Sequence, residues 1–219
     1  MSKRLVGLAG FLVLTLGLAA FAMLGARPAP SSAATPHTGK TETVVLAGGC
    51  FWGMEAVFES LKGVSKVVAG YAGGNKATAH YEIVSTGLTG HAESIQIEFD
   101  PSKITFDQLL NVYFLVAHDP TQLNRQSPDT GPQYRSAIFY TSDRQQGAAQ
   151  AYIRRLTKVK TFHDPIVTQI VPLRGFYPAE DYHQHYFDRN PNDSYIVYND
   201  KPKVQQLRKQ FPNLVKGRS

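Results

Sequence analysis

The 219-residue chain has little cysteine: Cys50 is its only one. A single cysteine excludes an internal disulfide and a Cys-x-x-Cys redox pair. The cysteine and histidine clusters of structural zinc sites are also missing. His183 and His185 are two positions apart and would lie on different sides of a helix, so no metal site is expected there. The lone thiol is therefore a reactive group, a partner in an intermolecular disulfide, or an inert buried side chain.

Long runs of one charge are absent as well. The formal net charge is +6, but much of the excess lies near the two ends of the chain. No basic run is interleaved with aromatic residues, so no nucleic-acid partner is expected. The basic residues near the ends are Lys3, Arg4, Arg208, Lys209, Lys216 and Arg218.

Charge is also missing from residues 5–26, an apolar run that follows two basic residues. This order is typical of an export signal, and Ala22 and Ala34 end small-residue segments that suit cleavage. The run also reaches the roughly 20 residues needed to span a bilayer. We therefore expect an exported protein, either periplasmic or tethered to the membrane by residues 5–26. Residues 1–40 are expected to be this signal or anchor plus a Pro/Ser/Ala linker.

Hydrophobic spacing predicts alternating strands and helices in residues 41–200, the expected catalytic domain. Their β-α-β-β-α-β order predicts an α+β fold, a ferredoxin-like two-layer sandwich with a mixed sheet and packed helices. Residues 119–135 form a polar loop too long for a simple connection, which indicates function. Residues 201–219 are expected to be a polar basic tail. The predicted strands are 42–48, 64–72, 93–99, 136–140 and 165–173, and the predicted helices are 50–62, 105–118, 142–159 and 178–190.

Cys50 lies between Gly48-Gly49, which end a predicted strand, and the start of a predicted helix. Free N–H groups and the helix dipole at that position favour a thiolate and can lower a thiol pKa from about 8.5 to about 3.5–7.5. The two glycines permit a sharp turn and leave space for a substrate. Phe51 fits the apolar face of the helix, whereas Trp52 does not and is expected either beside the thiol or in the core. These features alone do not separate a nucleophile from a buried, inert cysteine.

Later segments of the chain carry a resemblance that addresses this question. The segments GGCFWGMEAVFESLKGV, VAGYAGG, YEIVSTGLTGHAES, HDPTQLNRQSPDTGPQYRSAIFY and AEDYHQHY resemble those of the A-type peptide-methionine (S)-S-oxide reductases, in the same order. The resemblance runs from about Val44 to Tyr186, and GCFWG is a specific signal for the family. It implies an enzyme that reduces the S epimer of methionine sulfoxide, free or in proteins, and so repairs oxidised proteins.

The resemblance also implies roles for seven residues. Cys50 would attack the sulfoxide sulfur and be left as a sulfenic acid. Glu93 would protonate the departing oxygen, which requires a carboxyl pKa raised by burial. Tyr81 and Tyr134 match tyrosines that hydrogen-bond this oxygen, and Asp129 matches a carboxylate linked to substrate backbone binding and to regeneration. The aromatic residues that would hold the substrate methyl group are Phe51 and Trp52.

The same motifs contain further residues that we expect to support the site by hydrogen bonds. In one respect, however, the chain departs from the family. Many members resolve the sulfenic acid with additional C-terminal cysteines, whereas this sequence has none. We therefore expect an external thiol reductant that is thioredoxin-like, glutaredoxin-like or a small thiol. We also expect a monomer with no bound cofactor or metal. The expected supporting residues are Glu55, His91, Asp119, Glu180 and His183.

Two other functions remain open at this point. One is a thiol hydrolase in which His183 or His91 activates Cys50 and an acyl-enzyme forms. The other is a protein without catalysis, which binds oxidised methionine or serves as a tethered partner at the cell envelope.

Overall fold

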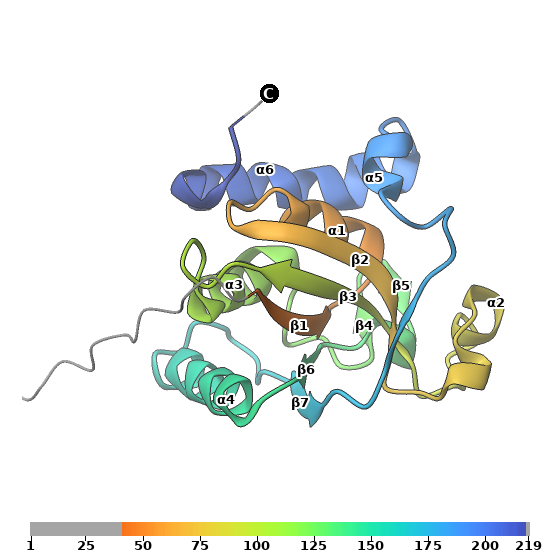
Figure 1. The fold of residues 1–219 in the computed structure, drawn as a ribbon, viewed down its shortest axis with the longest axis horizontal. Coiled ribbons are helices and arrows are strands. Elements are labelled where there is room, and N and C mark those ends of the chain that lie inside the picture. Colours follow the sequence, from red (N-terminus) through yellow and green to blue (C-terminus); the bar gives the residue numbers. More distant parts are fainter. Residues whose placement is uncertain (1–40, 218–219) are drawn as a thin grey trace, which may run out of the picture. The chain divides into compact units, whose positions relative to one another are not determined.

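The computed structural model describes residues 41–217, and its centre is a six-stranded sheet (Figure 1). The strands of this sheet are β1 (Glu42–Ala47), β2 (Val64–Ala72), β3 (Ala92–Phe99), β6 (Ala137–Tyr140), β7 (Gln169–Pro172) and β8 (Phe176–Pro178). Their order is β7-β6-β1-β3-β2-β8, with every neighbouring pair antiparallel except β6 and β7. The sheet is therefore mixed, as the sequence predicts.

Helices complete the predicted pattern. The α-helices are α1 (Phe51–Glu59), α2 (Tyr81–Val84), α3 (Phe106–Val112), α4 (Asp143–Lys158), α5 (Tyr186–Arg189) and α6 (Lys201–Gln210). The chain order β1-α1-β2-β3-α3-β6, with β6-β1-β3-β2 side by side, is a ferredoxin-like α+β arrangement. In Figure 1, α6 runs beside α1, and α4 lies beside α3. The α+β prediction is confirmed.

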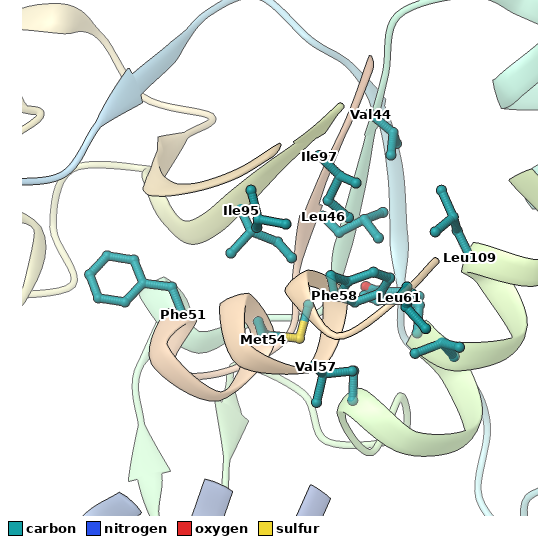
Figure 2. Close-up of a cluster of buried hydrophobic side chains, with 14 of the residues drawn as sticks. Val44, Leu46, Phe51, Met54, Val57, Phe58, Leu61, Ile95, Ile97 and Leu109 are labelled. Atoms are coloured by element: carbon teal, nitrogen blue, oxygen red, sulfur yellow. The ribbon is translucent and has the colours of Figure 1, made fainter. Parts of the chain in front are cut away.

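The main core lies between the sheet and α1 (Figure 2). Val44 and Leu46 of β1 face this core, because alternate residues of a strand point to the same face. The apolar face of α1 supplies Met54 and Phe58, which are fully buried. Burying a side chain of this size contributes roughly 1.5–3 kcal/mol. The core therefore fixes α1, and with it the position of Cys50 at the helix N-terminus.

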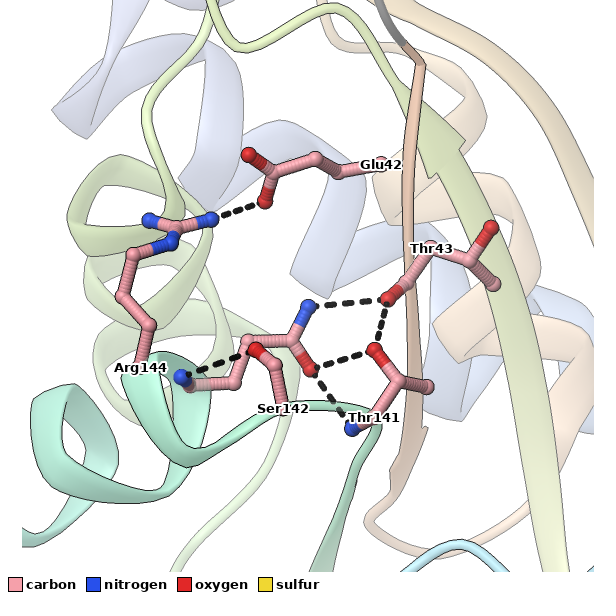
Figure 3. A network of polar contacts seen from close by, with 6 residues as sticks. Glu42, Thr43, Thr141, Ser142 and Arg144 are labelled. Atoms are coloured by element: carbon pink, nitrogen blue, oxygen red, sulfur yellow. Dashed lines mark hydrogen bonds and ion pairs between the residues drawn. The ribbon is translucent and has the colours of Figure 1, made fainter. Parts of the chain in front are cut away.

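A polar network joins the beginning of β1 to the beginning of α4 (Figure 3). Ser142 is the N-cap of α4 and accepts a hydrogen bond from the Gln145 backbone N–H at 3.3 Å. The Gln145 side chain donates to the Thr43 carbonyl at 2.8 Å, and Glu42 pairs with Arg144. Satisfying these N–H and C=O groups holds α4 against the sheet.

The predicted helix over 178–190 is wrong in most of its length. Strand β8 ends at Pro178, a series of turns covers 181–185, and the short helix α5 begins only at Tyr186. His185, the residue before α5, has φ +52°, in the left-handed region, so a helix cannot run continuously through it. The predicted loop over 119–135 contains local structure: a hairpin of β4 (Arg125–Gln126) and β5 (Asp129–Thr130), and the 3₁₀ turn Pro132–Tyr134. The segment between β2 and β3, for which no helix or strand was predicted, contains the 3₁₀ turn Lys76–Thr78 and α2.

The segment expected as a polar tail begins with α6, an amphipathic helix. Val204 and Leu207 of α6 are buried in the main core, against α1. Its other face carries lysine and arginine, which explains the polar composition. Residues 1–40, the expected signal or anchor and linker, lie outside the described residues. Within residues 41–217, no helix combines the length and apolar character needed to cross a bilayer.

Candidate functional site

Cys50 opens onto a small cavity of about 160 Å³ at the N-terminal end of α1. The lining comes from α1, α2, β3, the 119–135 loop and the segment before α6, which are far apart in the sequence. All seven residues singled out in the sequence meet here, together with one that was not. The lining residues are Cys50, Phe51, Trp52, Tyr81, Glu93, Asp129, Tyr134 and Tyr195.

Two glycines hold the backbone that leads into Cys50. Gly49 has φ +93°, which confirms the expected sharp turn. The expected space for a substrate beside these glycines is wrong, however. A Cβ on Gly49 would lie 2.6 Å from Cγ of Gln126, and one on Gly48 would lie 2.8 Å from Cγ of His118. The glycines therefore allow the polar loop to pack closely behind Cys50, while the substrate side is the cavity.

Replacing Gly49 by alanine is expected to destabilise the protein by about 2–4 kcal/mol, from the positive φ and the overlap with Gln126. Gln126 cannot move away easily, because its side chain bonds both the N–H and the C=O of Asp119, at 3.1 and 3.0 Å. Urea unfolding measures the change in free energy. Gly147→Ala in α4 is the matched control, since its Cβ would meet nothing within 4 Å and should stabilise the helix by about 0.5–1 kcal/mol. Equal unfolding midpoints for the two variants would contradict this explanation.

Glu93 and Cys50 share the N-terminus of α1. The Phe51 backbone N–H donates to Glu93 Oε2 at 3.1 Å, and the Trp52 N–H interacts with the Cys50 sulfur. Burial nevertheless raises the pKa of the Cys50 thiol well above its ordinary value, and the carboxyls of Glu93 and Asp200 raise it further. The expected lowering of the pKa is therefore wrong for the free site. The helix N-terminus is present, but desolvation and two acidic neighbours outweigh it.

Glu93 has the property that a proton donor near neutral pH requires. It projects from β3, is only 3% exposed, and its burial raises the pKa to about 8. The Phe51 N–H opposes this shift, while the Asp129 carboxylate adds to it. At pH 7 the Glu93 side chain is consequently a carboxylic acid next to a thiol.

Phenolic hydroxyls and Asp129 surround the other side of the cavity. Burial, together with Glu93 and other nearby ionisable groups, raises the pKa of Tyr81 and Tyr134, which keeps both as hydrogen-bond donors. Asp129 accepts a hydrogen bond from the Tyr195 hydroxyl, which fixes the carboxylate at the cavity edge. The site can thus offer a carboxylic acid and phenolic donors to one oxygen atom.

The Trp52 ring lines the cavity beside the Cys50 thiol, which is one of the two positions expected from the sequence. It stacks on Tyr186 with ring centroids 3.8 Å apart and meets the edge of Tyr195 at 5.8 Å. Its indole N–H donates to Nδ1 of His183 at 3.1 Å. With Phe51, these rings give the cavity one apolar wall suited to a methyl group.

All five expected supporting residues make hydrogen bonds, and for four of them these bonds hold the elements around the cavity. Glu180 accepts from the Tyr71 hydroxyl at 2.8 Å and from the Tyr81 backbone N–H at 3.0 Å. At the start of the polar loop, Asp119 accepts a hydrogen bond from the Thr121 backbone N–H at 2.9 Å. Glu55 accepts one from the N–H of His185 at 2.8 Å. His183, as the acceptor for Trp52, is the fourth of these residues.

The two histidines considered as bases of a thiol hydrolase do not line the cavity. Nδ1 of His183 is occupied by the Trp52 indole N–H. His91 bonds the Gly74 N–H at 3.2 Å and the Asn75 carbonyl at 2.9 Å with its two ring nitrogens. This geometry gives the hydrolase hypothesis no base next to Cys50.

Sequence reasoning missed the contribution of the segment just before α6. Tyr195 lines the cavity, and Asp200 is fully buried with one carboxylate oxygen 3.1 Å from Nζ of Lys203. A Cβ on Gly53 would lie 2.1 Å from Asp200 Oδ1, so Asp200 presses against α1 one turn after Cys50. These residues follow the recognised motifs. Their one available signal is the set of aromatic and apolar residues within PNDSYIVYND, which is unusual for a solvated tail.

Comparison with known proteins identifies the family of this chain. The model of the peptide methionine sulfoxide reductase family matches residues 42–215. The chain is 58% identical over 174 residues to peptide methionine sulfoxide reductase MsrA 2 of Mesorhizobium japonicum, covering 80% of this chain and 89% of that protein. It is 50% identical over 179 residues to the MsrA 2 of Synechocystis sp., covering 82% and 84%.

Solved structures of methionine sulfoxide reductases share the fold of this chain. Mxr1 from Saccharomyces cerevisiae in reduced form superposes with a TM-score of 0.67 at 34% identity, covering 71% of this chain and 88% of that one. Methionine sulfoxide reductase A of Corynebacterium diphtheriae superposes with a TM-score of 0.61 at 36% identity, covering 71% and 77%. The chain therefore belongs to the peptide methionine sulfoxide reductase family and is an oxidoreductase with the α+β fold of these enzymes.

Proposed function

We propose that this chain reduces the S epimer of methionine sulfoxide to methionine, both free and in proteins, and thereby repairs oxidised proteins. One observation carries the proposal. The chain's only thiol and a carboxyl group with a pKa of about 8 lie at the same helix N-terminus and line the same small cavity. A nucleophile and a proton donor are therefore in place for a substrate whose oxygen must be protonated before it can leave.

In the first half-reaction, Glu93 protonates the sulfoxide oxygen while the Cys50 sulfur attacks the sulfoxide sulfur. The thiol proton passes to the Glu93 carboxylate that this transfer has just produced. In the resulting adduct the new bond between the two sulfurs and the S–O bond of the substrate then break as the hydroxyl oxygen bonds to the Cys50 sulfur, which releases methionine. The net change is thiol plus sulfoxide to sulfenic acid plus thioether, so Cys50 loses two electrons and the substrate sulfur gains them. Because the Glu93 carboxylate accepts the thiol proton during the attack, no free thiolate has to form beforehand. The raised pKa of Cys50 therefore does not prevent the reaction.

The lining residues position the substrate for this step. The phenolic hydroxyls of Tyr81 and Tyr134 would bond the sulfoxide oxygen, and Phe51 and Trp52 would hold the methyl group against an apolar wall. Asp129 would accept a hydrogen bond from the substrate backbone. The volume of about 160 Å³ suits a side-chain terminus better than a folded segment.

The second half-reaction requires a thiol from outside, because this sequence holds no second cysteine. One thiol would condense with the sulfenic acid to form a mixed disulfide and water, and a second thiol would open that disulfide. A thioredoxin-like protein, a glutaredoxin-like protein or a small thiol could each serve. We also propose that the enzyme acts as a monomer without a bound cofactor, and that residues 5–26 place it outside the cytoplasm. The export proposal rests on the sequence of that segment alone.

A single-turnover experiment tests the chemistry. The reduced protein, freed of reductant, is mixed with a peptide containing either the S or the R sulfoxide. We expect one equivalent of methionine from the S peptide, none from the R peptide, and one added oxygen on Cys50 by mass spectrometry after trapping. A panel of thiol donors then identifies which class restores a second turnover. Methionine formation without oxidation of Cys50, or an acyl adduct on Cys50, would overturn the proposal, and stoichiometric binding without methionine would indicate a binder.

A further inference from the structure

A second group of polar side chains lies at the other end of α1. Glu55 and Glu59 are four residues apart, so both project from the same face of the helix, one turn from each other. His185 approaches them from the turn before α5, and its Nδ1 lies 2.9 Å from Glu59 Oε1. One ligand atom from each of the three residues lies within 4.8 Å of the others. Two carboxylates and an imidazole are thus brought together by segments 130 positions apart.

Glu55 is the unusual member of this group. It is only 1% exposed, and its Oε2 accepts the backbone N–H of His185 at 2.8 Å. The other oxygen, Oε1, is buried and has no hydrogen-bond partner within residues 41–217. An unpaired buried carboxylate oxygen is costly, so it points to something that is bound there. No lysine or arginine pairs with the Glu55 carboxylate among the described residues.

We propose that Glu55, Glu59 and His185 bind a divalent transition-metal ion, with Zn²⁺ as its representative. Carboxylate and neutral imidazole ligands suit such ions, whereas Mg²⁺ and Ca²⁺ prefer oxygen ligands alone. The metal would replace the proton between His185 and Glu59 and would give the unpaired Glu55 oxygen a positive partner. This site was not predictable from local sequence, because two of its ligands lie on α1 and the third, His185, lies 130 positions after Glu55.

The surroundings provide access from solvent. A cavity of about 390 Å³ borders the group, and its lining includes Glu59, His185 and the carboxylate residue Asp181. A hydrated ion can therefore enter from solvent and retain water in its remaining coordination positions.

Binding there would fasten the 181–186 turn to α1. That turn also supplies His183 and Tyr186, the two residues that hold the Trp52 ring. The ion would act by stabilising this region and takes no part in the sulfoxide chemistry. The inference stands apart from the proposed function, because neither Glu59 nor His185 lines the catalytic cavity.

Isothermal titration calorimetry with Zn²⁺ in a buffer that does not chelate metals tests the site. The titration uses the full chain and is repeated in the Cys50→Ser chain, so that the thiol is removed as a competing ligand. We expect one Zn²⁺ per chain, with binding weakened at least 10-fold by Glu59→Gln and by His185→Gln. Zn²⁺ at 100 times its Kd should raise the melting temperature of the parent by about 5–10 °C.

His163→Gln is the matched control. Its Nδ1 also lies 2.9 Å from a carboxylate, Asp164, but this pair is exposed and belongs to no group of three ligands among residues 41–217. Affinity should be unchanged in this variant. Glu55→Gln is avoided as the main test, since Glu55 also holds the backbone of His185 and its loss would perturb folding. Equal Zn²⁺ affinity in the parent, Glu59→Gln and His185→Gln chains would overturn the proposal, as would the absence of binding.

Discussion

Replacing Cys50 by serine should lower kcat/KM for the S sulfoxide by at least about 10³-fold, to the limit of detection. A serine oxygen cannot take the transferred oxygen atom, and the alcohol is a far weaker nucleophile than sulfur. The sequence contains no other cysteine that could substitute. Methionine release with dithiothreitol as reductant measures the loss.

The control for this variant separates chemistry from folding. Cys50 is 6% exposed and packs in the main core, so serine introduces a hydroxyl into a mostly apolar position. Its melting temperature and circular dichroism should show a folded protein, and the variant should still bind sulfoxide peptide. A folded Cys50→Ser chain with activity within 10-fold of the parent would rule out Cys50 as the nucleophile.

Replacing Glu93 by glutamine should slow sulfenic acid formation by about 10²–10⁴-fold, because the sulfoxide oxygen loses its proton donor. Glutamine keeps an oxygen that can accept the Phe51 N–H, which limits structural change. Rapid-quench single turnovers across pH provide the second readout. The parent rate should fall as pH rises through about 8, the pKa of Glu93, whereas the variant should show no such fall.

Stability against pH gives an independent check on the same carboxyl. The pKa of Glu93 is about 8 in the folded protein and about 4.5 when unfolded, so the folded state holds a proton that the unfolded state has lost. This stabilising contribution is fully present below about pH 4.5 and is lost as pH rises through about 8. Glu93→Gln should therefore gain stability relative to the parent between pH 6 and pH 9.

Glu98→Gln is the matched control, since Glu98 lies on the same strand but does not line the cavity. It should leave the single-turnover rate unchanged. If Glu93→Gln retained the parent's rate and pH profile, Glu93 would have no part in the proton transfer.

The order of the central strands and helices was predictable because each has a clear hydrophobic period. Phe51, Met54 and Phe58 recur at helical spacing, and ESIQIEF alternates as a half-buried strand. The turn at His185 was not predictable, since a left-handed histidine is held by Glu55, which lies 130 positions earlier. Local sequence contains no record of such a tertiary contact.

Seven of the eight residues that line the cavity were predictable through resemblance, whereas Tyr195 and the electrostatics of Cys50 were not. The position of the thiol at a helix N-terminus was readable from Gly49 and the helix period, and by itself it favours a thiolate. The pKa also depends on burial and on Asp200, a residue 150 positions away that presses on Gly53. The sign of the shift could therefore be obtained only from the folded arrangement.

Trp52 is the only tryptophan in the chain, and it lies in the wall of the catalytic cavity. The indole contacts His183, Tyr186 and Tyr195, so residues around the site contribute to its environment. Tryptophan emission, excited selectively over that of the 11 tyrosines, therefore comes from one site in this protein. We expect its intensity to change when substrate enters the cavity and when the neighbouring sulfur is oxidised, without any attached label.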